Sequence, residues 1–371
     1  MNNSFPKYDI KIYLTEDERH TPFIVKGLLS LERMGFIILQ FKSMPMLFKN
    51  RVELVDGKFI RGKKGYPWCP ELLIKKLDDN TELRIGIDLQ DWENYFSYHS
   101  LNSCNYIYKR AMTLETNKAL DAKIPNLFKP FGPNCNEKVD DIRYKLQIKL
   151  NSYKQIFPRV ISNPLILKNK VSFFDFNYKK FKNRNIIVNK YPKIEPPKEN
   201  YIFFQVEYHN WEGKTANKIN NFRAKIIRKL KYNFGKQFYG GMWFKGQINE
   251  KYEDCISNVH TDYEVYKSFI NNASIIISTN GFGDSIPWKL VECLKSGSFI
   301  ISEKNRHLFP YPFKNDEVIF FEDTEKCIQL CKKYLDDNEL RRKKTNKAKE
   351  YYQKYLEPSI VLKNIIENSF K

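Results

Sequence analysis

The sequence predicts an α/β protein with two domains in tandem, each built on a parallel β-sheet. Apolar segments with strand and helix periodicity alternate along both halves of the chain, an order typical of parallel sheets with right-handed crossovers. Between the halves, residues 191–198 contain three prolines, which resist helix and central strand, and a buried-strand pattern follows directly. A length of 371 residues is enough for two domains of ordinary size.

The first half begins its alternation at residue 9. A helix is expected over residues 23–34, with an apolar face and with Gly35 as its terminator. Residues 51–61 look like a hairpin that turns at Asp56 and Gly57. The expected strands of this half are residues 9–14, 36–41, 83–87 and 106–108.

The second half repeats the alternation more regularly. Its expected strands are residues 201–206, 238–243, 274–278, 299–302 and 318–321, with helices at 219–234, 263–270 and 288–295. We place the first domain at residues 1–190 and the second at residues 191–355. Ligands of open α/β sheets bind beyond the carboxyl ends of the strands, so we expect a cleft between the domains to hold the ligand.

Several classes of protein are disfavoured by the sequence. No apolar stretch approaches the roughly 18 residues of a membrane span, and the N-terminus lacks the features of a signal peptide, so a cytoplasmic location is expected. The seven cysteines are irregularly spaced and include no Cys-x-x-Cys. Neither a disulfide framework nor a zinc site is indicated.

The formal net charge of +20 predicts a surface that attracts polyanions. Nucleic acid, anionic lipid, and acidic glycan or nucleotide substrates all fit this charge. A compositional bias explains much of the excess equally well, because the chain is rich in Lys, Asn, Ile, Tyr and Phe together. Charge alone therefore leaves the partner open.

The most informative segment is residues 274–303. It reads as a strand, a polar loop with Gly281 and Gly283, a helix that starts near Pro287, a stop at Gly297, and a second strand. The glycines allow the backbone to approach a ligand closely. A helix N-terminus after such a loop is a ready site for an anion such as a diphosphate, because its free N–H groups point outward.

Side chains around this helix start fit the same ligand. Asp284 or Ser285 can cap the helix, and Lys289, one turn in, can reach a phosphate as a point charge. Glu292 lies on the same face as Lys289 and can accept hydrogen bonds from ribose hydroxyls. The alternative is an ordinary βαβ crossover in which Lys289 and Glu292 form a surface ion pair.

On these residues the segment resembles the donor-binding βαβ unit of the GT-B-fold glycosyltransferases, including exostosin-like and bacterial polysaccharide transferases. The pattern is Glu292, four residues, Gly297 and a strand. The resemblance implies that Ser285 and Lys289 lie at the donor's phosphates and that Glu292 binds its ribose. Many retaining members carry a second glutamate where this chain has Asp284, so a catalytic role there is not carried over.

The resemblance also implies an architecture. Two Rossmann-like domains would face a central cleft, and the last helix, residues 356–371, would cross back to the first domain after Pro358. Residues 201–245 fit the family's opening strand, helix and strand, and residues 128–134 resemble its Pro-Gly turn near the end of the first domain.

Further candidate residues follow predicted strands. Lys214 or Arg223 could supply a second phosphate contact, although basic residues are common throughout this chain. His20 could act as a general base or bind the acceptor, or it could belong to a capping turn. Asp88 or Asp91 could deprotonate an acceptor hydroxyl, but acidic residues after strands are also common caps.

The expected function is transfer of a sugar from a nucleotide diphosphate sugar to a glycan or lipid-linked saccharide in surface polysaccharide synthesis. No residue grouping has metal-ligand spacing and the Asp-x-Asp motif is absent, so we expect a metal-independent enzyme with no cofactor. The basic surface could hold it at the inner face of an anionic membrane. Two rivals stay open: a nucleic-acid-binding protein, which no recognised motif supports, and a catalytically inactive GT-B-like scaffold.

Overall fold

The computed structural model describes residues 5–14, 21–44, 51–61, 68–151, 194–210, 213–245, 249–314 and 316–371. The chain is an α/β protein, as predicted, and it divides into two compact units. Unit 1 comprises Met1–Pro164, Arg306–Pro312 and Lys354–Lys371, and unit 2 comprises Leu165–Asn305 and Phe313–Gln353. The boundary predicted between residues 190 and 191 falls outside the described residues, and the predicted cleft stays a prediction.

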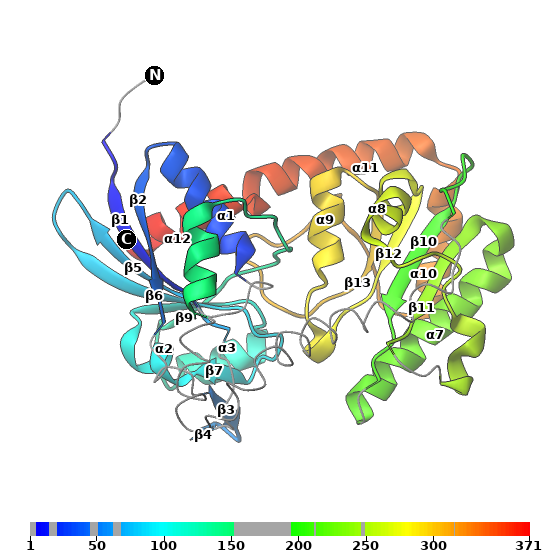
Figure 1. Cartoon of the computed structure of the whole chain (residues 1–371). Helices are drawn as coiled ribbons and strands as arrows, with labels where there is room; N and C mark the ends of the chain where they lie inside the picture. Colours follow the sequence, from blue (N-terminus) through cyan, green and yellow to red (C-terminus); the bar gives the residue numbers. More distant parts are fainter. Residues whose placement is uncertain are drawn as a thin grey trace, which may run out of the picture. The chain divides into compact units, whose positions relative to one another are not determined.

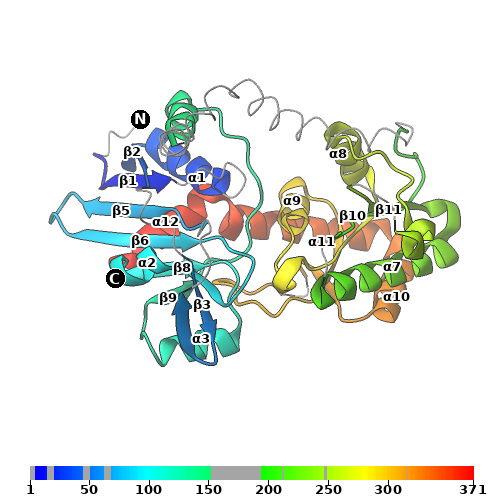
Figure 2. The ribbon, with the colours of Figure 1, turned by 60° about the horizontal axis from the view of Figure 1, so that its bottom comes forward.

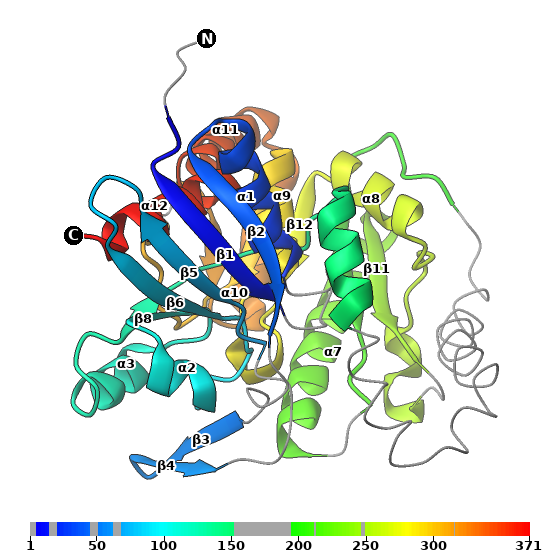
Figure 3. The same cartoon turned by 60° about the vertical axis from the view of Figure 1, so that its left-hand side comes forward.

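Unit 1 is built on a six-stranded sheet with the order β2-β1-β5-β6-β8-β9. Strand β1 pairs in parallel with β2 (Figure 3). Strand β8 pairs in parallel with β6 on one side and with β9 on the other. The strands are β1 (Tyr8–Leu14), β2 (Ile37–Ser43), β5 (Glu71–Lys76), β6 (Glu82–Asp88), β8 (Tyr106–Lys109) and β9 (Phe128–Pro130). Alternate residues of β1 are buried, as expected of a strand with one fully covered face.

Strand β5 corrects the prediction of a purely parallel sheet, because it runs antiparallel to both β1 and β6. Only residues 77–81 join β5 to β6, and a parallel crossover needs a dozen residues or more. Asn80 takes a positive φ of 60° in this turn, and Lys76 donates its N–H to the Thr81 carbonyl at 2.8 Å. The hairpin connection therefore dictates the direction of β5.

The last helix of the chain packs within unit 1. Helix α12 (Pro358–Ser369) lies against α1 (Pro22–Arg33) (Figure 1). Gly27 makes this contact possible, because a Cβ there would lie 2.4 Å from the Pro358 carbonyl oxygen. The unit also contains a small sheet of β3 (Arg51–Val55), β4 (Lys58–Arg61) and β7 (Tyr95–Ser97), and helices α2 (Tyr98–Ser103) and α3 (Leu114–Asp121).

Unit 2 holds a five-stranded sheet in which every pairing is parallel, with the order β11-β10-β12-β13-β14. Numbered along this unit, the order is 2-1-3-4-5, a common doubly wound arrangement. The strands are β10 (Ile202–Glu207), β11 (Phe238–Trp243), β12 (Ile275–Ser278), β13 (Ile300–Glu303) and β14 (Ile319–Phe321). They agree with the five strands predicted for the second half.

Helices cover both faces of the unit 2 sheet. On one face α7 (Lys214–Phe234) and α10 (Thr324–Leu335) lie side by side (Figure 2) and close a large apolar core with Ile202, Phe204 and Ile277. On the other face α8 (Tyr263–Asn272) packs its aromatic rings on Phe203. The remaining helices are α9 (Trp288–Ser296) and α11 (Asn338–Tyr351), which contact each other.

Helix α9 begins at Trp288, as predicted, but its cap differs from the prediction. Its N-cap is Pro287, and no side chain caps its first turn. Asp284 instead belongs to a short 3₁₀ turn, η5 (Phe282–Asp284), and Ser285 donates its backbone N–H to the Phe282 carbonyl. The helix ends at Gly297 in the left-handed conformation, with φ of 74°, as predicted for the glycine stop. No helix in the described ranges is long and apolar enough to cross a bilayer.

Candidate functional site

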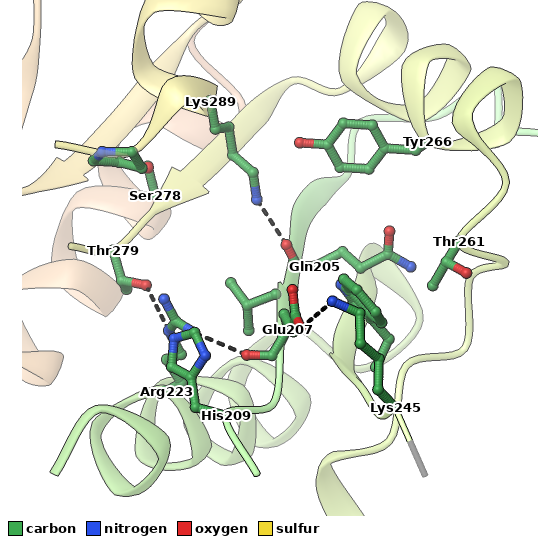
Figure 4. A pocket seen from close by; sticks show the side chains of 13 residues that line it. Gln205, Glu207, His209, Arg223, Lys245, Thr261, Tyr266, Ser278, Thr279 and Lys289 are labelled. Carbon is green, nitrogen blue, oxygen red and sulfur yellow. Dashed lines mark hydrogen bonds and ion pairs between the residues drawn. The ribbon is translucent and has the colours of Figure 1, made fainter. Parts of the chain in front are cut away.

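A cavity of about 490 Å³ lies at the carboxyl ends of β10 and β12 in unit 2 (Figure 4). From β10 the chain runs first to β11 on one side and later to β12 on the other, so the connections diverge here. Open α/β sheets bind their ligands at such a switch point. The volume is within the range of small-molecule sites, about 300–1,000 Å³.

Arg223 on α7 is the most deeply placed cation of the cavity, with a relative exposure of 5%. Its Nε donates to Thr279 Oγ1 at 3.2 Å, and its Nη1 donates to the Glu207 carbonyl at 2.8 Å and to His209 Nε2 at 3.1 Å. Its Nη2 donates to the Asn280 carbonyl at 3.2 Å. All four acceptors are neutral groups.

Among the described residues, no carboxylate therefore forms a direct ion pair with Arg223. Burial lowers the pKa of its guanidinium to about 10, and the more distant Glu303 and Glu207 only partly oppose this shift. The group stays charged at neutral pH. A guanidinium has five N–H donors, so one is left without a protein acceptor among the residues described.

Lys289, in the first turn of α9, is the second cation of the cavity. Its Nζ donates to the carbonyl of Gln205 at 2.7 Å (Figure 4), which leaves two ammonium N–H donors without a described acceptor. Burial lowers the pKa of Lys289 to about 8, and the charge of Arg223 adds to the shift, against Cys293 and Glu292. This partly buried amine is charged at neutral pH and would gain from an anion beside it.

Ser278 adds a neutral donor at the end of β12. It lines the cavity with a relative exposure of 1%, and its Oγ has no hydrogen-bond partner in the described part of the chain. A buried hydroxyl without a partner is unfavourable by about 1–3 kcal/mol, so such groups usually meet a ligand or water. Arg223, Lys289 and Ser278 thus offer donors to one space.

His209 and the Glu207–Lys245 pair complete the polar lining. Burial and the charges of Arg223 and Lys245 lower the pKa of His209 to about 4, so the ring is neutral at physiological pH. Its Nε2 accepts from Arg223, which places the ring proton on Nδ1. Lys245 forms an ion pair with Glu207, and both side chains are partly exposed, at 42% and 34%.

The structure brings only two of the predicted phosphate and ribose residues into the cavity lining, Arg223 and Lys289. Lys214 is exposed at the first residue of α7, and Gly283 and Ser285 belong to the turn before α9, where Ser285 Oγ lies against Gly281. Glu292 does not line the cavity. It lies close enough to Tyr266 and Lys289 to raise both pKa values, so its ribose contact stays a prediction.

The carboxylates predicted in unit 1 have different environments. Asp88 is 1% exposed, with Oδ2 3.4 Å from Lys109 Nζ and Oδ1 accepting from the Gln90 N–H at 3.0 Å. Burial raises the pKa of this carboxyl, and the role of Asp88 as a base stays a prediction. Asp91 pairs with Arg110 but keeps 30% of its side chain exposed. His20 lies outside the described residues.

A further part of the cavity lining is not predicted by any sequence motif. Trp243 at the end of β11, Thr261 before α8, and Tyr266 on α8 form an aromatic wall of the cavity, and the Tyr266 ring lies 5.8 Å from Lys289 Nζ. The sequence places Trp243 at the end of the predicted strand 238–243. This position is a usable signal, because ligands of open α/β sheets bind beyond the carboxyl ends of the strands. Within the described ranges, no group of three or more His, Cys, Asp or Glu is arranged to bind a metal ion.

Comparison with known proteins gives one family match. Residues 222–366 match a family described as glycosyl transferase-like. No curated protein matches the chain. Among solved structures, the chain is similar to the C-terminal domain of a glycosyl transferase group 1 family protein (LpcC) from Francisella tularensis, with 14% identity, 44% of this chain and 88% of that chain covered, and a TM-score of 0.30.

Two other solved structures have similar scores. TarM has 10% identity, with 92% of this chain and 88% of that chain covered, and a TM-score of 0.33. Sucrose-phosphate synthase from Thermosynechococcus elongatus has 10% identity, 47% of each chain covered, and a TM-score of 0.32. The family match covers residues 222–366, which is less than half of the chain. The predicted resemblance to glycosyltransferases is thereby shown for residues 222–366, the part of the chain that contributes Arg223 and Lys289 to the cavity.

Proposed function

We propose that the chain is a glycosyltransferase whose unit 2 cavity binds the diphosphate of a nucleotide diphosphate sugar. The observation that carries the proposal is the pair of cations in one cavity, Arg223 and Lys289, neither of which has a carboxylate within 4.0 Å among the described residues. Burying unpaired charges costs several kcal/mol, and an anionic ligand would offset much of this cost.

A diphosphate suits the donors better than a single carboxylate does. The unused N–H groups of Arg223 and Lys289 and the unpartnered hydroxyl of Ser278 converge from α7, α9 and β12. The diphosphate of a nucleotide sugar carries two negative charges and several acceptor oxygens, so it can neutralise both cations and accept from all three residues. The uncapped N-terminus of α9 adds a favourable dipole beside Lys289.

The acceptor side of the proposal rests on the family resemblance and on charge. We take the acceptor to be an oligosaccharide or a lipid-linked glycan of a surface polysaccharide, and the mechanism to need neither metal nor cofactor. His20, Asp88 and Asp91 are the candidate bases, and Asp91 is the more exposed of the two carboxylates. The net charge of +20 supports association with an anionic membrane surface.

Thermal unfolding with a panel of nucleotides and nucleotide sugars tests the donor site. A ligand at about 100 times its Kd should stabilise the native chain by about 2.7 kcal/mol. Arg223→Gln should abolish this stabilisation. Arg228→Gln is the matched control, because Arg228 lies on the same helix but pairs with Asp254 at the surface.

Each rival function has its own outcome in this test. Steeply salt-dependent affinity for DNA or RNA, without any response to nucleotides, would replace the proposal with a nucleic-acid-binding protein. Nucleotide-sugar binding without transfer or hydrolysis would indicate an inactive scaffold. If transfer is observed, Asp91→Asn should lower its rate while leaving the donor-induced stabilisation unchanged.

A further inference from the structure

The cavity has an aromatic wall that an anion does not explain. Trp243 ends β11 and is paired in register with Glu207 of β10, and Tyr266 reaches in from α8. A diphosphate needs hydrogen-bond donors and gains nothing from the face of an indole ring. This wall therefore suits a second, planar part of the ligand.

The positions of the strands order the cavity from one side to the other. Strand β11 is the edge strand and carries Trp243, whereas the cation site lies at the neighbouring β10 and β12. Beyond β12, at the end of β13, Glu303 accepts from the backbone N–H of Asn280 and lies near Asp284. The strand order thus places Trp243 on one side of the cation site and the carboxylates of Glu303 and Asp284, which do not themselves line the cavity, on the other side.

A nucleotide diphosphate sugar has this same order: base, ribose, diphosphate and sugar. The carboxylates of Glu303 and Asp284 suit the hydroxyls of a sugar, since carboxylate oxygens accept hydrogen bonds from O–H groups. The aromatic wall suits the base, since every nucleobase has a π-face. The hydroxyl of Thr261, on the same wall, has no hydrogen bond to any described residue and is available to the edge of a base.

The face of Trp243 is now covered by a side chain that can leave it easily. Lys245 Nζ lies 4.8 Å from the centre of the indole ring and pairs with Glu207. Both members of this ion pair are partly exposed, and such pairs contribute little to stability. A planar base can therefore replace the Lys245 ammonium on the ring.

We propose that Trp243 is the stacking platform for the nucleobase of the donor and that Lys245 leaves the indole face when the nucleotide binds. This inference rests on the proposed function, because it assigns the base end of the ligand whose diphosphate lies at Arg223 and Lys289. It makes Trp243 a determinant of nucleotide affinity and leaves pyrophosphate affinity independent of it.

Calorimetric titration of three variants tests the platform. The probes are inorganic pyrophosphate and whichever of UDP, GDP, ADP, CDP and dTDP binds the native chain most tightly. Trp243→Leu, which keeps apolar volume but removes the ring, should weaken nucleotide binding by about 10- to 100-fold, the range of base–aromatic stacking. Trp243→Phe should weaken it less than about 5-fold, and pyrophosphate affinity should not change in either. Trp92→Leu, in unit 1, is the control.

A second measurement uses the native chain and does not depend on whether Trp243→Leu folds. In the native chain, the nucleoside diphosphate should quench tryptophan fluorescence and pyrophosphate should not. The quenching should disappear in Trp243→Phe, which replaces one of the five tryptophans.

The possible results distinguish a failure of this inference from a failure of the proposed function on which it rests. Equal losses of nucleotide and pyrophosphate affinity in Trp243→Leu, or no loss of either, would overturn the platform while leaving the donor site in place. The platform is also wrong if the variant weakens the nucleotide sugar but not the bare nucleotide, because Trp243 would then hold the sugar. A native chain that binds neither pyrophosphate nor any nucleotide would overturn the proposed function itself, and the platform with it.

Discussion

Replacing Lys289 by methionine should raise the stability of the free protein and weaken its affinity for anions. Burial lowers the pKa of Lys289 from 10.5 to about 8, so the folded state disfavours its charge. The shift corresponds to a penalty of at most about 3 kcal/mol at neutral pH. Losing the hydrogen bond to the Gln205 carbonyl costs about 1–2 kcal/mol in return. The variant should therefore gain about 1 kcal/mol, or about 2–4 °C in Tm for a domain of this size.

The sign of the pH dependence follows from the same shift. Below pH 8 Lys289 is protonated in both the folded and the unfolded state, so the full penalty is present. Between pH 8 and 10.5 the unfolded chain holds the proton more tightly than the folded one, and stability rises with pH. The difference in unfolding free energy between Lys289→Met and the native chain should thus be largest below pH 8 and fade toward pH 10.5.

The assay combines denaturant unfolding across this pH range with calorimetric titration of pyrophosphate at pH 7. Losing one charge-assisted contact, about 1.5–3 kcal/mol, should weaken pyrophosphate binding by about 10- to 150-fold. Lys295→Met, at an exposed position of the same helix, is the control and should change neither quantity. A less stable Lys289→Met variant with unaltered pyrophosphate affinity would refute the reasoning, because Lys289 would then be a structural residue only.

Three further predictions concern other parts of the two units. Arg223→Lys should weaken pyrophosphate binding by about 1.5–3 kcal/mol in calorimetry, because a lysine keeps the charge but loses the fork of donors; unaltered affinity would contradict this. Gly241→Ala should lower the unfolding free energy by at least about 2 kcal/mol, since φ is 132° and a Cβ would lie 2.6 Å from the Cys255 carbonyl oxygen; an unchanged Tm would count against it. Lys109→Met should cost about 3–5 kcal/mol by leaving Asp88 buried and unpaired, and adding Asp88→Asn should recover much of this loss in the same denaturant assay.

Periodicity in the sequence found the strands of unit 2 but missed β5 of unit 1. The five strands of unit 2 are parallel and covered on both faces, and they stand out as apolar runs between helices. Strand β5 is short and ends in two lysines, so its apolar pattern is weak. The turn residues Asp78, Asp79 and Asn80 were a usable hairpin signal, but they specify antiparallel pairing only once both flanking strands are recognised.

Local sequence signals did not predict which residue caps α9. Gly297 was read correctly as a helix terminator, because the left-handed conformation is a local preference of glycine. Asp284 and Ser285 were wrongly expected to cap α9, because either residue suits a cap by type. The chain instead folds residues 282–284 into a 3₁₀ turn and starts the helix after Pro287. Which of several suitable residues takes the cap position depends on the path of the backbone between the preceding strand and the helix.

The sequence by itself determined the α/β class, the strands of the second domain, and the presence of Arg223 and Lys289 near strand ends. These features follow from local periodicity and from residue type, which do not need tertiary contacts. Only the tertiary structure decided which basic residues share a cavity, because burial and neighbours are set by strand order, and the order 2-1-3-4-5 brings α7 and α9 to the same switch point. The same strand order places Trp243 at the cavity and leaves Lys214 at the surface. In a sequence with so many basic residues, Lys214 and Arg223 are equally good candidates for a phosphate contact, and only burial distinguishes them.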